Sequence, residues 1–427
     1  MYLGILLSLC CLAPMFSEAY QVKPFNIDLS SRVPHMKDAI KNTVLPTSSV
    51  LGSAGKGIEL AWLRDRQVEW LEGYNWKHEE EKLNRFNHSL IEIEGQTVHF
   101  IHQRAQDPGA TPVLLIHGWP GSFYEFHEVI TPLSSEDKDT PFHVIVPSLP
   151  GFGFSSPVPA GWTLNNTAKM FDTLMHDVLG YDSYIAVGGD WACVAIWALH
   201  NNHPEHIKAV LYTGLVPHLI PPLEQLLGDS HFAGPAESLT PEEKQRMQDN
   251  VIWGQDSNAY FLEMTTRPAT IGLALYDNPI GQLAWMGEKY LEYSDPQYGV
   301  PPSTITNNTI LTAVSIYYLT QTFETAANIY YQNPAGFHHH LIKAVNDIPM
   351  GFSEYRYEPT YYPMFYLAEM GNLVFHSAHK RGGHFSALDN PPAYVSDIRR
   401  FTSLLQTRSG NEKMQQINEQ NRVHSEL

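Results

Sequence analysis

A short segment at residues 188–192, Gly-Gly-Asp-Trp-Ala, constrains the fold of this chain more than any other feature of its sequence. An apolar, β-branched run precedes it at 183–187, and a helix-compatible stretch follows at 192–200. Small residues at this spacing are typical of a sharp strand-to-helix turn, because neighbouring backbone passes close to such a turn. The segment therefore predicts Asp190 at the carboxyl end of a parallel strand and at the N-terminus of the next helix.

Asp190 at such a turn has two interpretations. A carboxylate can act as a nucleophile that opens an sp3 carbon–oxygen or carbon–halogen bond and leaves an enzyme ester behind. The alternative is an ordinary helix N-cap, which is a common role for aspartate. The segment alone leaves both interpretations open, so other landmarks in the chain must decide between them.

Two more apolar runs end in glycine-rich segments. The run at 113–116 leads into the segment 117–122, His-Gly-Trp-Pro-Gly-Ser, whose exposed backbone N–H groups suit an oxyanion hole. An ordinary strand-to-helix turn is the alternative there, and the Trp119–Pro120 bond is a candidate cis peptide. The run at 142–147 leads into the segment 150–155, Pro-Gly-Phe-Gly-Phe-Ser.

A histidine near the far end of the chain is a candidate general base. His384 follows a predicted strand at 372–376 and precedes a helix expected to begin near Pro391. A loop behind a strand is where this topology carries its base. A surface role is the alternative for an isolated histidine.

Together these segments resemble the α/β-hydrolase fold and, more narrowly, the epoxide hydrolases of the microsomal type. The resemblance covers about residues 25–401. The motifs at 117–126, 150–155, 189–191 and 382–385 stand in the family's order. The resemblance implies an α/β class, with a mostly parallel central sheet, a helical cap insertion and an N-terminal extension that wraps around both.

The resemblance also implies an organisation along the chain. We expect a signal peptide at 1–19 and the N-terminal extension at 20–104. The hydrolase core is expected at 105–213 and 341–408, the cap at 214–340, and a polar tail at 409–427.

Family roles transfer to individual positions of this sequence. Asp190 would be the nucleophile, and His384 the base that activates water to hydrolyse the ester. Glu358 would orient the His384 ring. Glu354 is the alternative acid, because the family's Phe-Pro dipeptide before the acid reads Arg-Tyr at 356–357 here.

The resemblance further implies two tyrosines that donate a proton to the opening epoxide. They match Tyr260 and Tyr317, with Tyr318 as the alternative to Tyr317. The backbone N–H groups of Trp119 and Trp191 would hold the developing oxyanion. The mechanism needs neither a cofactor nor a metal, and we interpret the triple histidine at 338–340 as a polar surface stretch.

Two other functions remain open from the sequence. A haloalkane dehalogenase shares the Asp nucleophile and the catalytic histidine, but it needs no cap tyrosines as acids. A non-catalytic, ligand-binding member of the fold would lack the nucleophile, base or tyrosines. The tyrosine pair favours the epoxide hydrolase.

Composition and the two ends of the chain predict its partners and location. A net charge of −18 disfavours nucleic acid and anionic membranes as partners. The uncharged run at 2–16 is followed by the small-x-small pattern of a cleaved signal, after which we expect no stable membrane insertion. Glycosylation sequons begin at Asn87, Asn165 and Asn307, and the chain ends in His-Ser-Glu-Leu. We therefore expect a protein of the secretory pathway, in the ER lumen or secreted, that acts on a small apolar epoxide and water.

Overall fold

A mixed β-sheet organises the part of the chain that the structure describes. The structure is a computed structural model, and it describes residues 20–135, 140–215, 220–334 and 343–407. The expected signal peptide, the expected polar tail and the triple histidine lie outside these residues. Within them, the sheet has nine strands in the order β1-β2-β3-β5-β4-β6-β7-β8-β9.

The strands fall into an antiparallel part and a parallel part. Neighbouring strands are antiparallel along the series β1-β2-β3-β5. They are parallel along the series β5-β4-β6-β7-β8-β9. Their bounds are β1 Lys23–Pro24, β2 His88–Ile93, β3 Gln96–Gln103, β4 Thr111–Ile116, β5 Phe142–Pro147, β6 Tyr184–Gly188, β7 Ile207–Tyr212, β8 Pro349–Tyr357 and β9 Asn372–Gly383.

The central parallel strands form the core because both of their faces are covered. Every residue of β5 and β6 is buried. This fits their continuous apolar runs, since strands that pack on both sides do not alternate with polar residues. The strands expected at 113–116, 142–147 and 183–187 are therefore confirmed.

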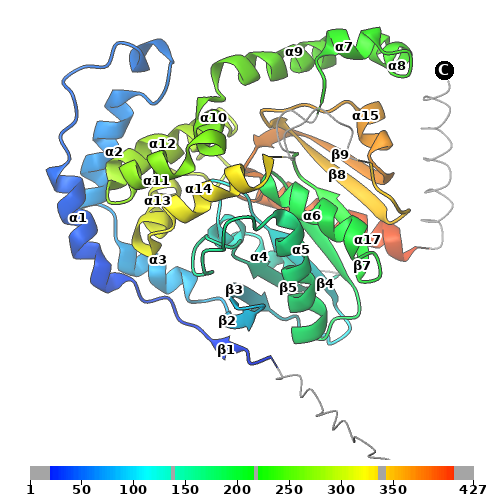
Figure 1. Cartoon of the computed structure of the whole chain (residues 1–427), viewed down its shortest axis with the longest axis horizontal. Coiled ribbons are helices and arrows are strands. Elements are labelled where there is room, and N and C mark those ends of the chain that lie inside the picture. Colours follow the sequence, from blue (N-terminus) through cyan, green and yellow to red (C-terminus); the bar gives the residue numbers. More distant parts are fainter. Residues whose placement is uncertain (1–19, 136–139, 216–219, 335–342, 408–427) are drawn as a thin grey trace, which may run out of the picture.

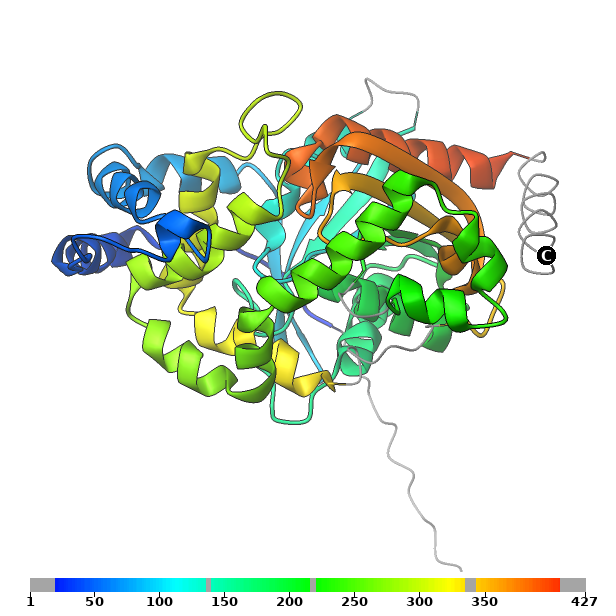
Figure 2. The same cartoon turned by 90° about the horizontal axis from the view of Figure 1, so that it is seen from above.

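Helices cover both faces of the sheet (Figures 1 and 2). α5 (Leu164–Thr173) and α6 (Trp191–Asn202) pack together on one face. α4 (Ile130–Ser134) and α17 (Pro391–Gln406) lie on the other, where the Arg399 guanidinium donates to the carbonyls of Thr140 and Pro132. α15 (Met364–Glu369) and α16 (Ser386–Asp389) connect the last strands and helix.

A group of helices lies between β7 and β8 in the chain and covers the carboxyl ends of the parallel strands (Figure 1). Capping residues set several of their starts: Thr240 and Glu243 form a capping box on α9, and the Asn278 side chain accepts from the N–H of Gly281 on α12. Their bounds are α7 Leu223–Gly228, α8 Ala233–Glu237, α9 Pro241–Asp256, α10 Ala259–Thr266, α11 Pro268–Leu275, α12 Pro279–Glu292, α13 Asn307–Thr320 and α14 Phe323–Gln332.

The N-terminal segment wraps around the outside of these helices, at the left of Figure 1. Its helices α1 (Val33–Asn42), α2 (Leu60–Glu72) and α3 (Trp76–Leu83) pack on α12 and α13, and β1 adds a strand to the sheet edge. The buried indole of Trp70 donates to the Ser315 hydroxyl over 3.1 Å. The segment therefore contacts both the sheet and the helices above it.

β9 is longer than the sequence predicts. It was expected at 372–376, but it continues to Gly383 because its pairing with β8 extends to Tyr357. His384 therefore follows the strand directly. In the described residues, no helix combines the length and the apolar character needed to cross a membrane.

Candidate active site

Asp190 lies at the turn from β6 into α6, where its backbone has φ +50° and ψ −136°. A left-handed φ is costly for a residue with a side chain, and such strain is typical of functional turns. The turn directs the Asp190 carboxylate towards the loop after β4, where the Trp119–Pro120 bond is cis.

The Asp190 carboxylate is not a helix cap. Asp190 has the N-cap position of α6 but makes no side-chain capping hydrogen bond. Its Oδ1 instead accepts from the backbone N–H of Trp119 over 2.8 Å. Gly118 permits this approach, because a Cβ on it would stand 2.0 Å from the same oxygen. The N-cap alternative is therefore wrong.

His384 lies between Asp190 and Glu358. Its Nε2 is 3.4 Å from Asp190 Oδ2, and its Nδ1 is 3.1 Å from each Glu358 oxygen. Its backbone N–H donates to the Tyr293 carbonyl over 2.8 Å, which fixes the residue from the opposite side. Burial alone would lower the pKa of His384, but the flanking Glu358 and Asp190 carboxylates outweigh it and hold that pKa well above its usual value.

The structure separates the two candidate acids. Glu358 directly follows β8 and contacts His384. Glu354 lies within β8, where it forms ion pairs with Arg246 and with His376. Glu354 therefore has other partners, and Glu358 is the acid that lies at His384.

Tyr260 and Tyr317 both lie near Asp190. The Tyr260 ring stacks on the Trp119 indole with centroids 5.3 Å apart. The Tyr317 hydroxyl donates to the Gly121 carbonyl over 2.7 Å. Burial, with the nearby Asp190 carboxylate adding to it, raises the pKa of both phenols above its usual value. Both side chains are therefore protonated and able to donate a hydrogen bond at neutral pH.

Tyr318 points elsewhere. Its hydroxyl donates to the Asp277 carboxylate over 2.5 Å, at a part-exposed position that His35 also contacts. Of the two neighbouring tyrosines, Tyr317 is the one that the fold brings to the loop of Trp119.

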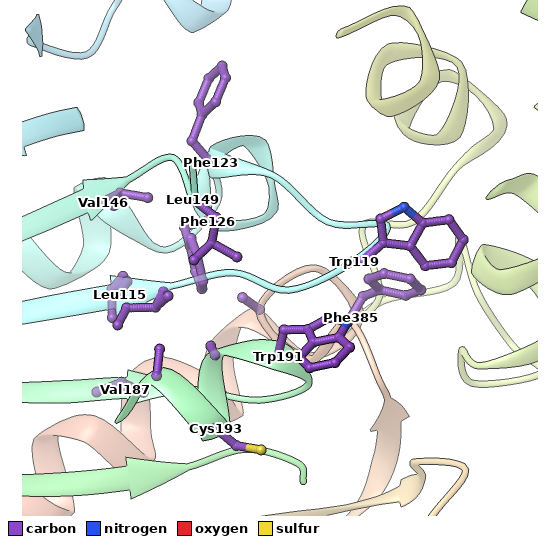
Figure 3. Packing of buried hydrophobic residues seen from close by; sticks show 14 of the residues in the cluster. Leu115, Trp119, Phe123, Phe126, Val146, Leu149, Val187, Trp191, Cys193 and Phe385 are labelled. Atoms are coloured by element: carbon purple, nitrogen blue, oxygen red, sulfur yellow. The ribbon is translucent and has the colours of Figure 1, made fainter. Parts of the chain in front are cut away.

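Trp191 begins α6 immediately after Asp190. Figure 3 shows its ring beside those of Trp119 and Phe385, beyond the ends of the strands that carry Leu115 and Val187. The ring of Tyr330 meets the Trp191 ring edge to face at 4.9 Å and the Trp119 ring at 5.7 Å. These aromatic side chains make the surroundings of Asp190 largely apolar.

Sequence reasoning missed several residues at this site. Tyr293 directly follows α12 and Tyr330 lies on α14, and their contacts cannot be deduced from the spacing of tyrosines. Glu125 borders a small cavity together with Asp190 and His384. A signal for it was present, because Glu125 is the one acidic residue in the motif at 117–126.

The candidate site contains no metal-binding cluster. Across the described parts of the chain, no group of three or more His, Cys, Asp or Glu side chains has an arrangement that could hold a metal ion.

Comparisons with known proteins identify the family. A model of the epoxide hydrolase N terminus matches residues 22–126, and a model of the alpha/beta hydrolase fold matches residues 111–249. The structure of Aspergillus niger epoxide hydrolase is 32% identical with a TM-score of 0.78, and the match covers 90% of this chain and 97% of that one. Juvenile hormone epoxide hydrolase from the silkworm Bombyx mori is 26% identical with a TM-score of 0.80, over 90% of this chain and 95% of that one.

A curated relative supports the same assignment. Epoxide hydrolase 1 of Sus scrofa is 28% identical over 422 residues, which cover 92% of this chain and 91% of the relative. This chain therefore belongs to the epoxide hydrolase family of the α/β-hydrolases, and it is a hydrolase that acts on ether bonds.

Proposed function

We propose that this chain converts an epoxide to a vicinal diol through a covalent ester on Asp190. One observation carries the proposal: the two oxygens of a single carboxylate meet two different partners. Oδ1 accepts from the Trp119 N–H at 2.8 Å, and Oδ2 lies 3.4 Å from His384 Nε2. Nucleophilic attack and ester hydrolysis need this pairing of an oxyanion donor with a base.

In the first step, an Asp190 oxygen attacks the less hindered epoxide carbon. A carbon–oxygen bond forms to the carboxylate while the ring carbon–oxygen bond breaks. Tyr260 and Tyr317 donate hydrogen bonds to the departing ring oxygen, and one of them gives it a proton, which leaves a hydroxyl group on the substrate and a tyrosinate on the enzyme. The protonated state of both buried phenols supports these roles.

In the second step, His384 removes a proton from water and the resulting hydroxide attacks the ester carbonyl. The backbone N–H groups of Trp119 and Trp191 stabilise the tetrahedral oxyanion. The bond from acyl carbon to alcohol oxygen then breaks, and the imidazolium returns its proton to the diol. Collapse leaves Asp190 as a carboxylic acid with one oxygen from water, and its proton passes to His384, which restores the carboxylate and the protonated ring of the free enzyme.

Charge loss on Asp190 would switch His384 from acid to base. In the free enzyme, the Asp190 carboxylate helps to raise the pKa of His384. Formation of the ester removes that negative charge, so the pKa of His384 falls and the ring passes its proton to the tyrosinate that ring opening left behind. Glu358 orients the ring through Nδ1.

The surroundings of Asp190 favour an apolar substrate. Trp119, Trp191, Tyr260, Tyr330 and Phe385 are all buried, and burial around a reacting centre favours uncharged groups. We therefore propose a small apolar epoxide as substrate, with water as the second reactant.

The test is to trap the ester on variants of the purified protein. With styrene oxide as probe, His384→Gln is expected to accumulate a mass adduct on Asp190, and Asp190→Ala is expected to form no adduct and no diol. His376→Gln changes a histidine that pairs with Glu354 instead, and it serves as the matched control with near-normal turnover.

Two outcomes would contradict the proposal. One is the absence of an adduct on the His384→Gln protein. The other is a single turnover in heavy-oxygen water that labels the diol directly and leaves the Asp190 carboxylate unlabelled. Halide release from haloalkanes by a protein that leaves styrene oxide untouched would indicate a dehalogenase.

We also propose that the protein acts in the secretory pathway, in the ER lumen or outside the cell. The apolar N-terminal segment and the His-Ser-Glu-Leu ending support this location. Asn87 and Asn165 are exposed, so an oligosaccharide transferase can reach both, whereas Asn307 is half-buried. In a eukaryotic host, Asn87→Gln and Asn165→Gln should each remove one glycan, and unglycosylated cytosolic protein would contradict the proposal.

A further inference from the structure

A small cavity lies directly beside the nucleophile and the base. The volume that the centre of a water molecule can occupy in it is about 10 Å³. This is room for about one water. Three ionisable side chains border it: Asp190, His384 and Glu125. The first two have roles in the proposed function, whereas Glu125 has none.

The backbone around Glu125 is held rigidly. Glu125 belongs to a short 3-10 helix, Phe123–Phe126, whose first turn is capped by the Ser122 hydroxyl. Its own N–H donates to the Ser122 carbonyl over 2.9 Å. The side chain therefore starts from a fixed position immediately after the oxyanion loop.

The Glu125 carboxyl group occupies space that is open because residue 121 is glycine. A Cβ on Gly121 would stand 2.4 Å from Glu125 Oε2. Since residue 121 has no side chain, the carboxyl group can lie over the loop and border the cavity that Asp190 and His384 share. No hydrogen bond from another described residue engages this carboxyl group, so it is free to bind what fills the cavity.

The protonation state of Glu125 suits a water ligand. Burial raises the pKa of its carboxyl group against the opposing effect of His384, and with smaller contributions from the Asp190 and Glu358 carboxylates that pKa reaches about 8. The phenols of Tyr290, Tyr317 and Tyr394 also face it. At neutral pH the group is thus a neutral acid, which offers one hydrogen-bond donor and an acceptor oxygen.

We propose that Glu125 is a further catalytic residue that holds the hydrolytic water against His384. This rests on the proposed ester on Asp190. The water gives one proton to His384 Nε2 and donates its other hydrogen to the Glu125 carbonyl oxygen, while its oxygen bonds to the ester carbon. Glu125 gains and loses no proton in this step, so its role is to orient the reactant and to keep it in an otherwise apolar site.

The test separates ester formation from ester decay by rapid quenching and mass spectrometry, with styrene oxide as the probe. In Glu125→Leu, ester formation should stay within about threefold of wild type, whereas ester decay should slow by roughly 100-fold and the adduct should accumulate. Glu125→Gln retains a donor and an acceptor, so its ester decay should slow by less than about tenfold. Glu125→Ala serves where leucine disturbs folding.

Glu128→Gln is the matched control, because Glu128 is exposed, lies three residues further on and pairs with His127. It should leave both steps unchanged. Wild-type ester decay in Glu125→Leu would overturn the role of Glu125 while the ester mechanism stands. Equal slowing by glutamine and leucine would overturn its role as a neutral acid. Absence of any adduct in His384→Gln would instead overturn the proposed function.

Discussion

At the scale of single residues, the site depends on Gly118, because glycine has no side chain. Gly118 faces Asp190 so closely that a Cβ on residue 118 would stand 2.0 Å from Asp190 Oδ1 and 2.6 Å from Asp190 Cβ. Asp190 itself has a positive φ, so it has little freedom to move away. The hydrogen bond from the Trp119 N–H exists only because residue 118 is glycine.

Gly118→Ala is therefore expected to reduce turnover of styrene oxide by at least about 100-fold, since a displacement near 1 Å at a reacting centre costs about that much. Gly228→Ala is the control, because a Cβ there would meet nothing within 4 Å. Steady-state kinetics and the thermal midpoint measure the two effects separately. Near-normal turnover in Gly118→Ala would show that turnover does not depend on the close approach of residue 118 to the Asp190 carboxylate.

The proposed role of the two cap tyrosines as proton donors leads to a second prediction at this scale. Tyr317→Phe removes a phenol that lies near Asp190, so ester formation should slow by roughly 10- to 100-fold while ester decay stays unchanged. Tyr318→Phe is the matched control, because that hydroxyl contacts Asp277 and not the active site. Equal single-turnover rates in the two variants would contradict the assignment of Tyr317.

Local sequence identifies a residue's chemistry but not its neighbours. Asp190 and His384 could be predicted because each lies in a short motif that its turn requires. The choice of Glu358 over Glu354 rested on the family resemblance alone, since the two lie only four residues apart and only the structure pairs Glu354 with Arg246. Glu125 was not predicted because it comes close to Asp190 only in the folded chain, and local sequence does not reveal that proximity.

At the scale of elements, buried histidines join β2, β3 and the loop after β5. His88 Nδ1 and His99 Nε2 are 2.9 Å apart, and His99 Nδ1 is 2.9 Å from the Ser148 hydroxyl. Burial lowers the pKa of His88, and burial with the neighbouring His88 and His117 holds that of His99 well below its usual value. Burial also lowers the pKa of His117 to about 4. These rings are neutral in the folded protein.

Acid should therefore destabilise this part of the sheet. The unfolded histidines bind protons below about pH 6.5, and the folded ones do not, so the stability they contribute is complete above that pH and is lost as the pH falls towards 4. Replacing His99 by Met should make the free energy of unfolding less steep between pH 6.5 and 4.5, by about 1.4 kcal/mol per pH unit. Exposed His78→Gln is the control, and an unchanged slope in His99→Met would contradict the argument.

The elements themselves could be predicted where the sequence is locally consistent. Continuous apolar runs gave the central strands, because both faces of those strands are buried. The full length of β9 could not be predicted, since residues 377–383 are polar or small and are held in the strand by pairing with β8. Long-range pairing overrides local pattern there.

At the scale of the whole molecule, the N-terminal segment supports the helix that carries Tyr317. Trp70 on α2 is fully buried and donates to Ser315 on α13, and Tyr74 donates to Thr312 on the same helix. The Arg32 guanidinium donates to the Leu319 carbonyl near the end of α13. Tyr317 lies between these points, so its position depends on the segment that wraps around the cap.

Trp70→Ala is expected to lower the free energy of unfolding by about 3–5 kcal/mol, because it leaves a cavity and an unpaired Ser315 hydroxyl. Ester formation should also slow, since α13 loses the side chain that holds Tyr317 against the loop of Gly121. Trp70→Phe keeps most of the packing and loses only the hydrogen bond, so its cost should stay near 1 kcal/mol. Urea unfolding and single-turnover kinetics measure the two effects. If Trp70→Ala destabilised the fold but left ester formation unchanged, the extension would stabilise the cap without positioning Tyr317.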